Sequence, residues 1–352
     1  MEPVVRRRMP KAVARGSRPL VLAACALAII GVAFAGCGPA AEHGKQGARA
    51  AAAPPPRAAM APILAHSPFA IATGPDGRLW FTEYQAPYVG RMTPEGEVKS
   101  FRIAENGFAE RITAGPDGAL WFSEPSGNRI GRITVEGHVS YAKLPEPGCG
   151  PAGITAGRGY VYFSEHSAAR IGRLSPAGKL TEFALAAGSG PGAIAVAPDG
   201  SVYFAQDEAN SIGKLSTTGK ITVYPIPTPD SVPGGLAVDA GGDVYFTELR
   251  AAKIGKLTPD GKMTEFELPL KDPPLSIAAG LDGNLWVTAP RGHVVYRLTP
   301  SGQVSIFGGA KSGISPTFIT SGPDGNLYFT EPAGLIGRIT TAGKIREFLL
   351  SK

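Results

Sequence analysis

The chain has 352 residues, 43% of them hydrophobic, so it can bury a large core. Glycine (47) and proline (33) together exceed a fifth of the chain and charged residues make up 18%, a balance that disfavours long helices and coiled coils and favours short strands joined by tight turns. The formal net charge is +6, but residues 1–36 carry six basic residues and one acid and so account for +5 of it. The remaining chain is near neutral, and its charge gives no reason to expect nucleic acid as a partner.

The first 36 residues resemble an export signal. Basic residues end at Arg18, an apolar run too short for a comfortable membrane span follows, and Ala33-Phe34-Ala35 matches an A-x-A cleavage pattern. Phe34-Ala35-Gly36-Cys37 resembles a bacterial lipobox. We therefore predict an exported, membrane-anchored lipoprotein with lipidated Cys37 as its mature N-terminus. Cleavage after Ala35, giving a secreted or periplasmic soluble protein, and retention as an uncleaved anchor are the alternatives.

Residues 37–62 are rich in alanine and proline and cannot bury enough apolar surface to fold, so we predict a flexible tether. If Cys37 is lipidated and Cys25 is lost with the signal, Cys149 has no cysteine partner. A small buried or loop thiol is the favoured interpretation of Cys149. A nucleophilic role is the alternative, but no histidine lies near it in the sequence.

From about Pro68 the sequence repeats itself seven times, with a period of 41 or 42 residues. One phrase, typified by GPDGALWF at 115–122, places a Trp or Tyr at the same point of each copy, and a second, typified by Ile130-Gly131-Arg132, keeps the same period. The aromatic positions are Trp80, Trp121, Tyr162, Tyr203, Tyr245, Trp286 and Tyr328. Self-similarity at a fixed period indicates a repeat architecture.

Each repeat is expected to form four short antiparallel strands. A Pro-Asp-Gly turn, in which Gly supplies a positive φ, joins an apolar first strand to a second strand of the type Leu-Trp-Phe-Thr/Ser-Glu. The third strand contains Ile-Gly-Arg, where we expect the glycine to mark a close approach of neighbouring blades. Four such strands about every 41 residues are typical of a propeller blade. We therefore predict an all-β, seven-bladed β-propeller over residues 63–352, with the second-strand aromatics packed between blades.

The string ITAGPDGALWFSEPSGNRIGRIT at 112–134 closely resembles the repeat of the virginiamycin B lyase (streptogramin lyase) family, and the resemblance covers all seven repeats. It implies a seven-bladed propeller that opens the ester of a cyclic depsipeptide antibiotic by elimination. It also implies a magnesium ion and a histidine base at one end of the central channel. No zinc-protease, phosphate-loop or nucleophile-elbow motif is present.

In that family the catalytic histidines occupy the variable residue at the start of the first strand, in a Pro-His-Gly/Ala-Ile phrase on two blades. These seven residues, termed the start positions, are here Phe69, Glu110, Ala152, Gly192, Gly234, Leu275 and Thr317. None of them is histidine. Glu110 can accept a proton, and His166 follows Glu165 on the same face, so Glu110 and His166 are the candidates for a relocated catalytic base.

A glutamate ends the second strand in five repeats, and other polar residues depart from the repeat at the same end. The recurrence favours an ion pair or turn bond within each blade, and a carboxylate-lined ligand funnel is the alternative. The candidate funnel residues are Glu83, Glu124, Glu165, Gln206, Asp207, Glu248, Arg250, Arg291, His293 and Glu331. Their spacing defines no metal site, so magnesium is implied by the resemblance alone.

Three functions remain open. The absence of histidine at the start positions favours a binding or interaction propeller that takes a small molecule or peptide on the funnel face. The family resemblance favours a carbon–oxygen lyase with a relocated base. A sugar-lactone hydrolase is the third, and would need a calcium site of Glu, Asn and Asp at the channel. We expect a monomer that contacts the membrane through its N-terminal lipid.

Overall fold

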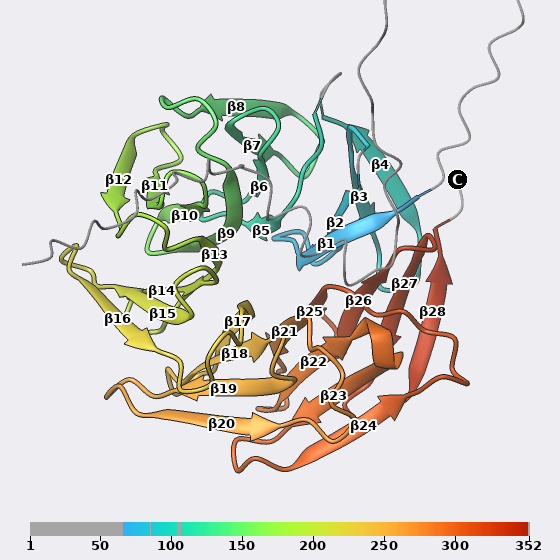
Figure 1. Ribbon diagram of the computed structural model, residues 1–352. Coiled ribbons are helices and arrows are strands. Elements are labelled where there is room, and N and C mark those ends of the chain that lie inside the picture. The colour runs from blue at the N-terminus through green and yellow to red at the C-terminus, as the bar shows by residue number, and fades with distance from the viewer. Residues whose placement is uncertain (1–65, 85, 104–106, 351–352) are drawn as a thin grey trace, which may run out of the picture. The chain divides into compact units, whose positions relative to one another are not determined.

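The described residues form 28 β-strands and one short 3₁₀ helix, grouped into seven four-stranded sheets (Figure 1). This computed structural model describes residues 66–84, 86–103 and 107–350, all within the unit of residues 43–352. The predicted signal, Cys37 and the tether lie outside the described residues. In every sheet, strands that are consecutive in the chain pair antiparallel, so each blade is completed from its own repeat.

The four strands of each blade recur with similar bounds. The first strands are β1 (Pro68–Thr73), β5 (Ile112–Ala114), β9 (Pro151–Gly157), β13 (Pro191–Val196), β17 (Pro233–Val238), β21 (Ser276–Ala279) and β25 (Ile319–Ser321). The second strands are β2 (Leu79–Glu83), β6 (Leu120–Glu124), β10 (Tyr160–Glu165), β14 (Val202–Gln206), β18 (Val244–Glu248), β22 (Leu285–Ala289) and β26 (Leu327–Glu331). The third strands are β3 (Tyr88–Met92), β7 (Arg129–Ile133), β11 (Arg170–Leu174), β15 (Ser211–Leu215), β19 (Lys253–Leu257), β23 (Val294–Leu298) and β27 (Leu335–Ile339). The fourth strands are β4 (Val98–Arg102), β8 (Val139–Lys143), β12 (Leu180–Ala184), β16 (Ile221–Pro225), β20 (Met263–Glu267), β24 (Val304–Gly308) and β28 (Ile345–Leu349), and the 3₁₀ helix η1 is Pro290–Gly292.

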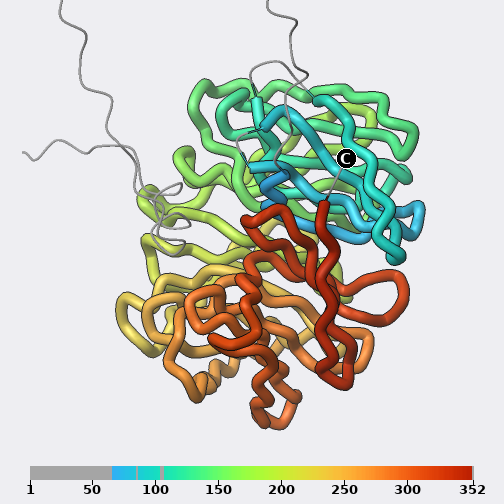
Figure 2. Tube along the Cα trace, turned by 90° about the vertical axis from the view of Figure 1, so that its right-hand side faces the viewer, coloured from blue at the N-terminus to red at the C-terminus, as the bar shows by residue number. Residues whose placement is uncertain are grey.

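The seven sheets stand around a central axis, with the first strands innermost and the fourth strands outermost (Figure 1). Neighbouring first strands contact one another around the whole ring, including β1 of the first blade and β25 of the seventh. Figure 2 shows the seventh blade, in red, against the first blade, in blue. The ring therefore closes by packing between the first and last blades, without an exchanged strand, and the predicted seven-bladed propeller is confirmed.

An apolar cluster fills each junction between neighbouring blades in the described part of the chain. At the first junction the fully buried Trp80 packs with Leu120 and Phe122 of the second blade. At the junction that closes the ring, Tyr328 packs with Leu79 and Phe81 of the first blade. The other five clusters combine residues of adjacent blades in the same way. The prediction that the second-strand aromatics pack between blades is confirmed.

The glycine of the third strand has a different role from the one expected. Gly131 lies opposite Phe122 in its own blade, and a Cβ at Gly131 would stand 2.1 Å from the Phe122 ring. In the sixth blade, where the glycine is replaced by Tyr296, the residue opposite it is the smaller Val287. The expected close approach of neighbouring blades was therefore wrong: the glycine makes room for an aromatic ring of the same blade.

Candidate functional site

The start positions lie at the end of the ring axis where the first strands begin. A Thr or Ser hydroxyl near the end of the second strand holds the start position of the next blade in six of the seven blades. Thr82 donates to the carbonyl of Glu110 at 3.0 Å, and Ser123 donates to that of Ala152 at 2.7 Å. Four further bonds of this kind join the second strand of one blade to the start residue of the next: Ser164 to Gly192, Thr247 to Leu275, Thr288 to Thr317 and Thr330 to Phe69. The sequence signal for these bonds is the Thr or Ser before the last residue of the second strand, a position that was not among the predicted site residues.

His166 and Asp207 form a pair across the third and fourth blades. The Nε2 atom of His166 lies 3.2 Å from Oδ1 of Asp207, and the side chains are only 10% and 16% exposed. Backbone bonds place both residues, because the His166 amide donates to Gly150 and the Asp207 amide donates to Gly190. A carboxylate bonded to one ring nitrogen fixes the orientation and tautomer of an imidazole.

Glu110 lies close enough to this pair to interact with it electrostatically. It precedes β5 and is partly buried. Burial raises the pKa of Glu110, and the charges of Arg111 and His166 oppose that rise. The two residues predicted as candidates for a relocated base, Glu110 and His166, therefore lie within electrostatic range of each other, and Asp207 is paired with His166.

Arg111 carries a guanidinium with no hydrogen-bond or ion-pair partner in the described part of the chain. Its central carbon lies 3.9 Å from the ring centroid of Phe318 and 5.6 Å from that of Phe69, so it reaches from the second blade to the first and seventh. Burial lowers the pKa of Arg111, an effect that the negative charge of Glu110 opposes. The residue thus offers unpaired N–H donors above an aromatic surface.

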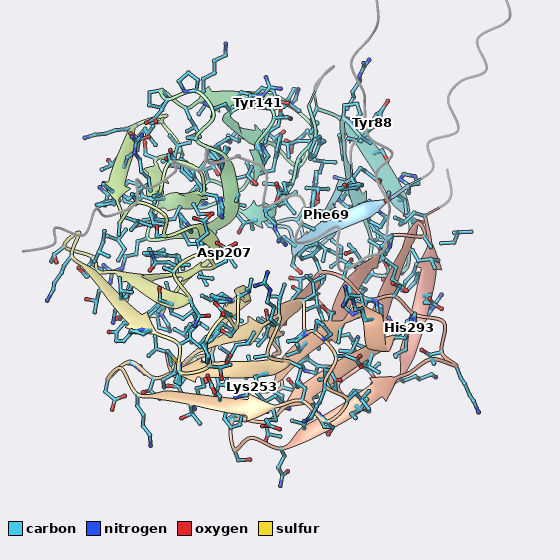
Figure 3. The ribbon with its side chains drawn as sticks, viewed as in Figure 1. Phe69, Tyr88, Tyr141, Asp207, Lys253 and His293 are labelled. Atoms are coloured by element: carbon cyan, nitrogen blue, oxygen red, sulfur yellow. The ribbon has the colours of Figure 1, made fainter. Side chains whose placement is uncertain are left out.

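Aromatic rings cover the side of the site formed by the seventh, first and second blades. Phe69 packs on Phe318 with ring centroids 4.6 Å apart and on Tyr84 at 5.6 Å, and Tyr84 lies 6.5 Å from Phe108. Figure 3 places Phe69 and Asp207 toward the middle of the ring. We define the axial site as Phe69, Tyr84, Glu110, Arg111, His166, Asp207 and Phe318.

Sequence reasoning missed Arg111 and Phe318, although a signal for both was present. The residue after the start position is small in the other five repeats: Ala70, Gly153, Ala193, Gly235 and Ser276. Arg111 and Phe318 are the two departures from this pattern, and the structure brings them into contact.

The repeated glutamates are buried within their blades, each 0–3% exposed. Glu124 accepts two bonds from Arg129, and Glu83 accepts bonds from His66 at 2.5 Å and from the Ser67 amide at 2.8 Å. These contacts match the ion pair and turn bond that recurrence favours, and the Ser315 amide donates to Glu331. The carboxylates of Glu165 and Glu248 have no hydrogen-bond partner among the described residues. Burial raises the pKa of three members of the set to about 7: Glu165, Glu248 and Glu331. Contact of any of these carboxylates with a ligand stays a prediction.

The remaining predicted funnel residues come from the fourth, fifth and sixth blades, and Arg291 and His293 lie at the same 3₁₀ helix. Gln206 is buried and accepts a bond from Ser211 at 3.2 Å, while Arg250 and Arg291 are exposed. His293 has a left-handed backbone (φ 56°), and its Nδ1 lies 2.7 Å from the Ile314 carbonyl oxygen. Figure 3 shows His293 farther from the centre of the ring than Phe69.

The described residues form no site of three or more protein ligands for the magnesium ion that the resemblance implies. Among residues 66–350, as far as they are described, no group of three or more His, Cys, Asp or Glu side chains is arranged to share an ion. The carboxylates of Glu83 and Glu124 are directed to partners in their own blade instead.

Comparison with known proteins places this geometry in a family. The family model described as "Virginiamycin B lyase family" matches residues 57–273 and 161–352. A streptogramin B lyase structure is 29% identical, over 81% of this chain and 95% of the other, with a TM-score of 0.74. Virginiamycin B lyase from Staphylococcus aureus is 30% identical, over 78% and 94% of the two chains, with a TM-score of 0.73.

A third structure is a catalytically inactive histidine-to-alanine variant of the Staphylococcus aureus virginiamycin B lyase with quinupristin. It is 31% identical to this chain over 78% of its length and 94% of the other chain, with a TM-score of 0.73. No curated protein sequence matches the chain. The seven blades and the matches over nearly the whole propeller agree, and the chain belongs to the virginiamycin B lyase family.

Proposed function

We propose that this propeller binds a small molecule or peptide rich in carbonyl groups at the axial site, without opening it. The observation that carries the proposal is Arg111, whose N–H donors have no partner among the described residues and which lies against Phe318 and Phe69. An arginine presents five donors in a fixed fork, and the rings beside it offer a surface for an apolar group of the ligand. The absence of histidine at the start positions favours binding over catalysis.

Quinupristin is the first probe, because it accompanies a solved relative. We expect calorimetric titration to show saturable binding to the purified protein, and Arg111→Gln to weaken it about 10- to 100-fold, the usual worth of hydrogen bonds from a charged donor. Arg102→Gln, at an exposed arginine on the outermost strand β4, is the matched control and should leave the affinity unchanged. Failure of quinupristin to bind, or equal binding by Arg111→Gln, would contradict the assignment.

One observation favours a second candidate, a lyase with a relocated base. His166 is paired with Asp207 at 3.2 Å and lies near Glu110, an arrangement that orients an imidazole beside a second proton-accepting group. General acid–base catalysis requires such a group within reach of the proton that is removed. Turnover of a depsipeptide would distinguish this candidate from simple binding.

We also propose that the protein is exported and anchored through a lipid on Cys37. The support is the Phe34-Ala35-Gly36-Cys37 motif behind a basic and then apolar segment. Within the described residues, no helix has the length and apolar character needed to cross a bilayer. We expect Cys37→Ser to move the protein from the membrane to the soluble fraction. An unchanged distribution, with intact mass showing cleavage after Ala35, would contradict lipidation.

A further inference from the structure

The third blade lacks an ion pair that recurs in most other blades. In five blades the base of the third strand lies within 4 Å of a carboxylate from the turn between the first and second strands; these pairs are Arg91–Asp76, Arg132–Asp117, Lys214–Asp199, Lys256–Asp243 and Arg338–Asp324. In the sixth blade Arg297 instead donates to the Thr341 carbonyl and the Ser305 hydroxyl. The equivalent Arg173 of the third blade has neither kind of partner among the described residues. Its Nε is buried without a hydrogen bond, as are those of Arg297 and Arg338, so the missing partner of the guanidinium is what sets Arg173 apart.

Arg173 lacks this ion pair because the turn between β9 and β10 is shorter and carries an arginine in place of the aspartate. In the second blade Ala114 pairs with Leu120, so five residues, including Asp117, form the connection. In the third blade Gly157 pairs with Tyr160, so only Arg158 and Gly159 form it. Both have positive φ angles, 51° and 79°, which is the geometry of a two-residue hairpin turn. Counted back from the second-strand aromatic, Arg158 occupies the position of Asp117.

A pocket of about 230 Å³ opens beside these two arginines, between the third and fourth blades. It lies at the turn between β9 and β10, the opposite end of the blade from the axial site. Its lining includes Arg158, Tyr160, Tyr162, Arg173, Phe183 and Gly200. The guanidinium of Arg173 stands between two rings, 4.9 Å from the centroid of Tyr160 and 5.3 Å from that of Phe183.

The charges around the pocket are predominantly positive. Arg158 donates to the backbone carbonyl of Asp199 at 2.7 Å, which holds its guanidinium at the pocket. The carboxylate of Asp199 is itself engaged by Ser201 and by Lys214, at 3.6 Å. It therefore does not replace the missing partner of Arg173.

The neighbouring groove supplies an internal comparison. A pocket of about 180 Å³ lies at the equivalent place between the second and third blades and is lined by Trp121 and Arg132. There the Nε of Arg132 donates to Asp117 at 2.6 Å, so the arginine is already neutralised. The two pockets share their location and differ in whether a carboxylate is built in.

We infer that the pocket between the third and fourth blades binds a small organic anion, a carboxylate or phosphate group carried on a flat ring. The anion would take the place that a turn aspartate fills in other blades, accepting hydrogen bonds from Arg173 and Arg158. The ring would pack beside the Arg173 guanidinium, against the aromatic side chains that line the pocket, Tyr160, Tyr162 and Phe183. The pocket is smaller than a typical drug-sized site, which limits the ligand to about one ring.

Benzoate and phenyl phosphate are the probes, with inorganic phosphate as the ring-free comparison. Calorimetry should give a dissociation constant below about 1 mM for at least one ring-bearing anion. Side-chain NMR of ¹⁵N-labelled arginine should shift the Arg173 Nε–H signal on titration. Comparing benzoate with phenyl phosphate identifies the preferred anionic group. Inorganic phosphate binding as tightly as phenyl phosphate would overturn the requirement for a ring.

Arg158→Asp is the decisive variant, because it restores the carboxylate of the other blades in an Asp-Gly pair that a two-residue hairpin favours. We expect it, and separately Arg173→Gln, to weaken binding at least tenfold. Arg132→Gln, at the arginine already held by Asp117, should change nothing. Circular dichroism and the unfolding midpoint confirm that each variant is folded. Absence of binding at millimolar probe, or an equal loss in Arg132→Gln, would overturn the inference.

Discussion

We expect the free energy of unfolding of the propeller to fall as pH rises from about 5 to about 8, because three buried carboxyls hold protons more tightly in the folded state than in the unfolded chain. Burial, and secondarily a neighbouring glutamate, raises the pKa of each from 4.5 to about 7. The three carboxyls and their neighbours are Glu165 with Glu182, Glu248 with Glu265, and Glu331 with Glu347.

The direction of this pH dependence follows from how many protons each state binds. Between the unfolded and folded pKa values the folded protein binds more protons than the unfolded chain, so raising the pH favours unfolding. Below the pKa of the carboxyl in the unfolded chain, both states are protonated, and the carboxyl does not lower the free energy of unfolding. Each carboxyl could contribute about 3 kcal/mol across this window, since one pH unit corresponds to about 1.4 kcal/mol. The total should therefore be several kcal/mol, measurable as the urea midpoint at pH 5, 6, 7 and 8.

Replacing Glu165, Glu248 and Glu331 together by glutamine mimics the protonated carboxyls and should flatten the pH dependence. Glu124→Gln is the matched control, because the Glu124 carboxylate is paired with Arg129 and the substitution removes an ion pair instead of a buried proton. Stability that is constant from pH 5 to 8, or a triple variant with the slope of the unmodified protein, would show that these carboxyls ionise freely in the folded state.

The propeller could be predicted because its information is local and repeated. The aromatic at Trp80 and its equivalents, the Pro-Asp-Gly turn and the constant period each define one blade, and seven copies define the ring. The role of the third-strand glycine could not be read in this way. Its partner, Phe122 in the case of Gly131, lies opposite it in the antiparallel pairing, so the reason for the glycine appears only when the register is known.

The candidate site was predicted only in part, because contacts between different blades are not visible in the repeat. Glu110 and His166 were found as departures from the repeat; the ring places them within electrostatic range of each other and pairs His166 with Asp207. Arg111 was missed because the rings that it contacts belong to other blades, Phe318 being more than 200 positions away in the chain. The repeat indicates which residues are exceptional. It does not show which exceptional residues face one another across the axis.

The absence of histidine at the start positions leads to the last prediction, that the protein lacks strong streptogramin-lyase activity. Elimination needs a base aimed at the proton beside the ester, and positioned acid–base groups typically contribute about 10²–10⁴-fold to the rate. Of the seven start positions only Glu110 can accept a proton. Purified protein with magnesium and quinupristin should therefore give no linear product by mass spectrometry.

The same assay identifies the base if this prediction is wrong. Turnover at rates typical of the family would overturn it and establish the lyase candidate. A loss of that turnover by about 10²-fold or more in His166→Ala would assign the base to the imidazole paired with Asp207. A comparable loss in Glu110→Gln, with His166→Ala still active, would assign it to the carboxyl of Glu110, whose pKa burial raises.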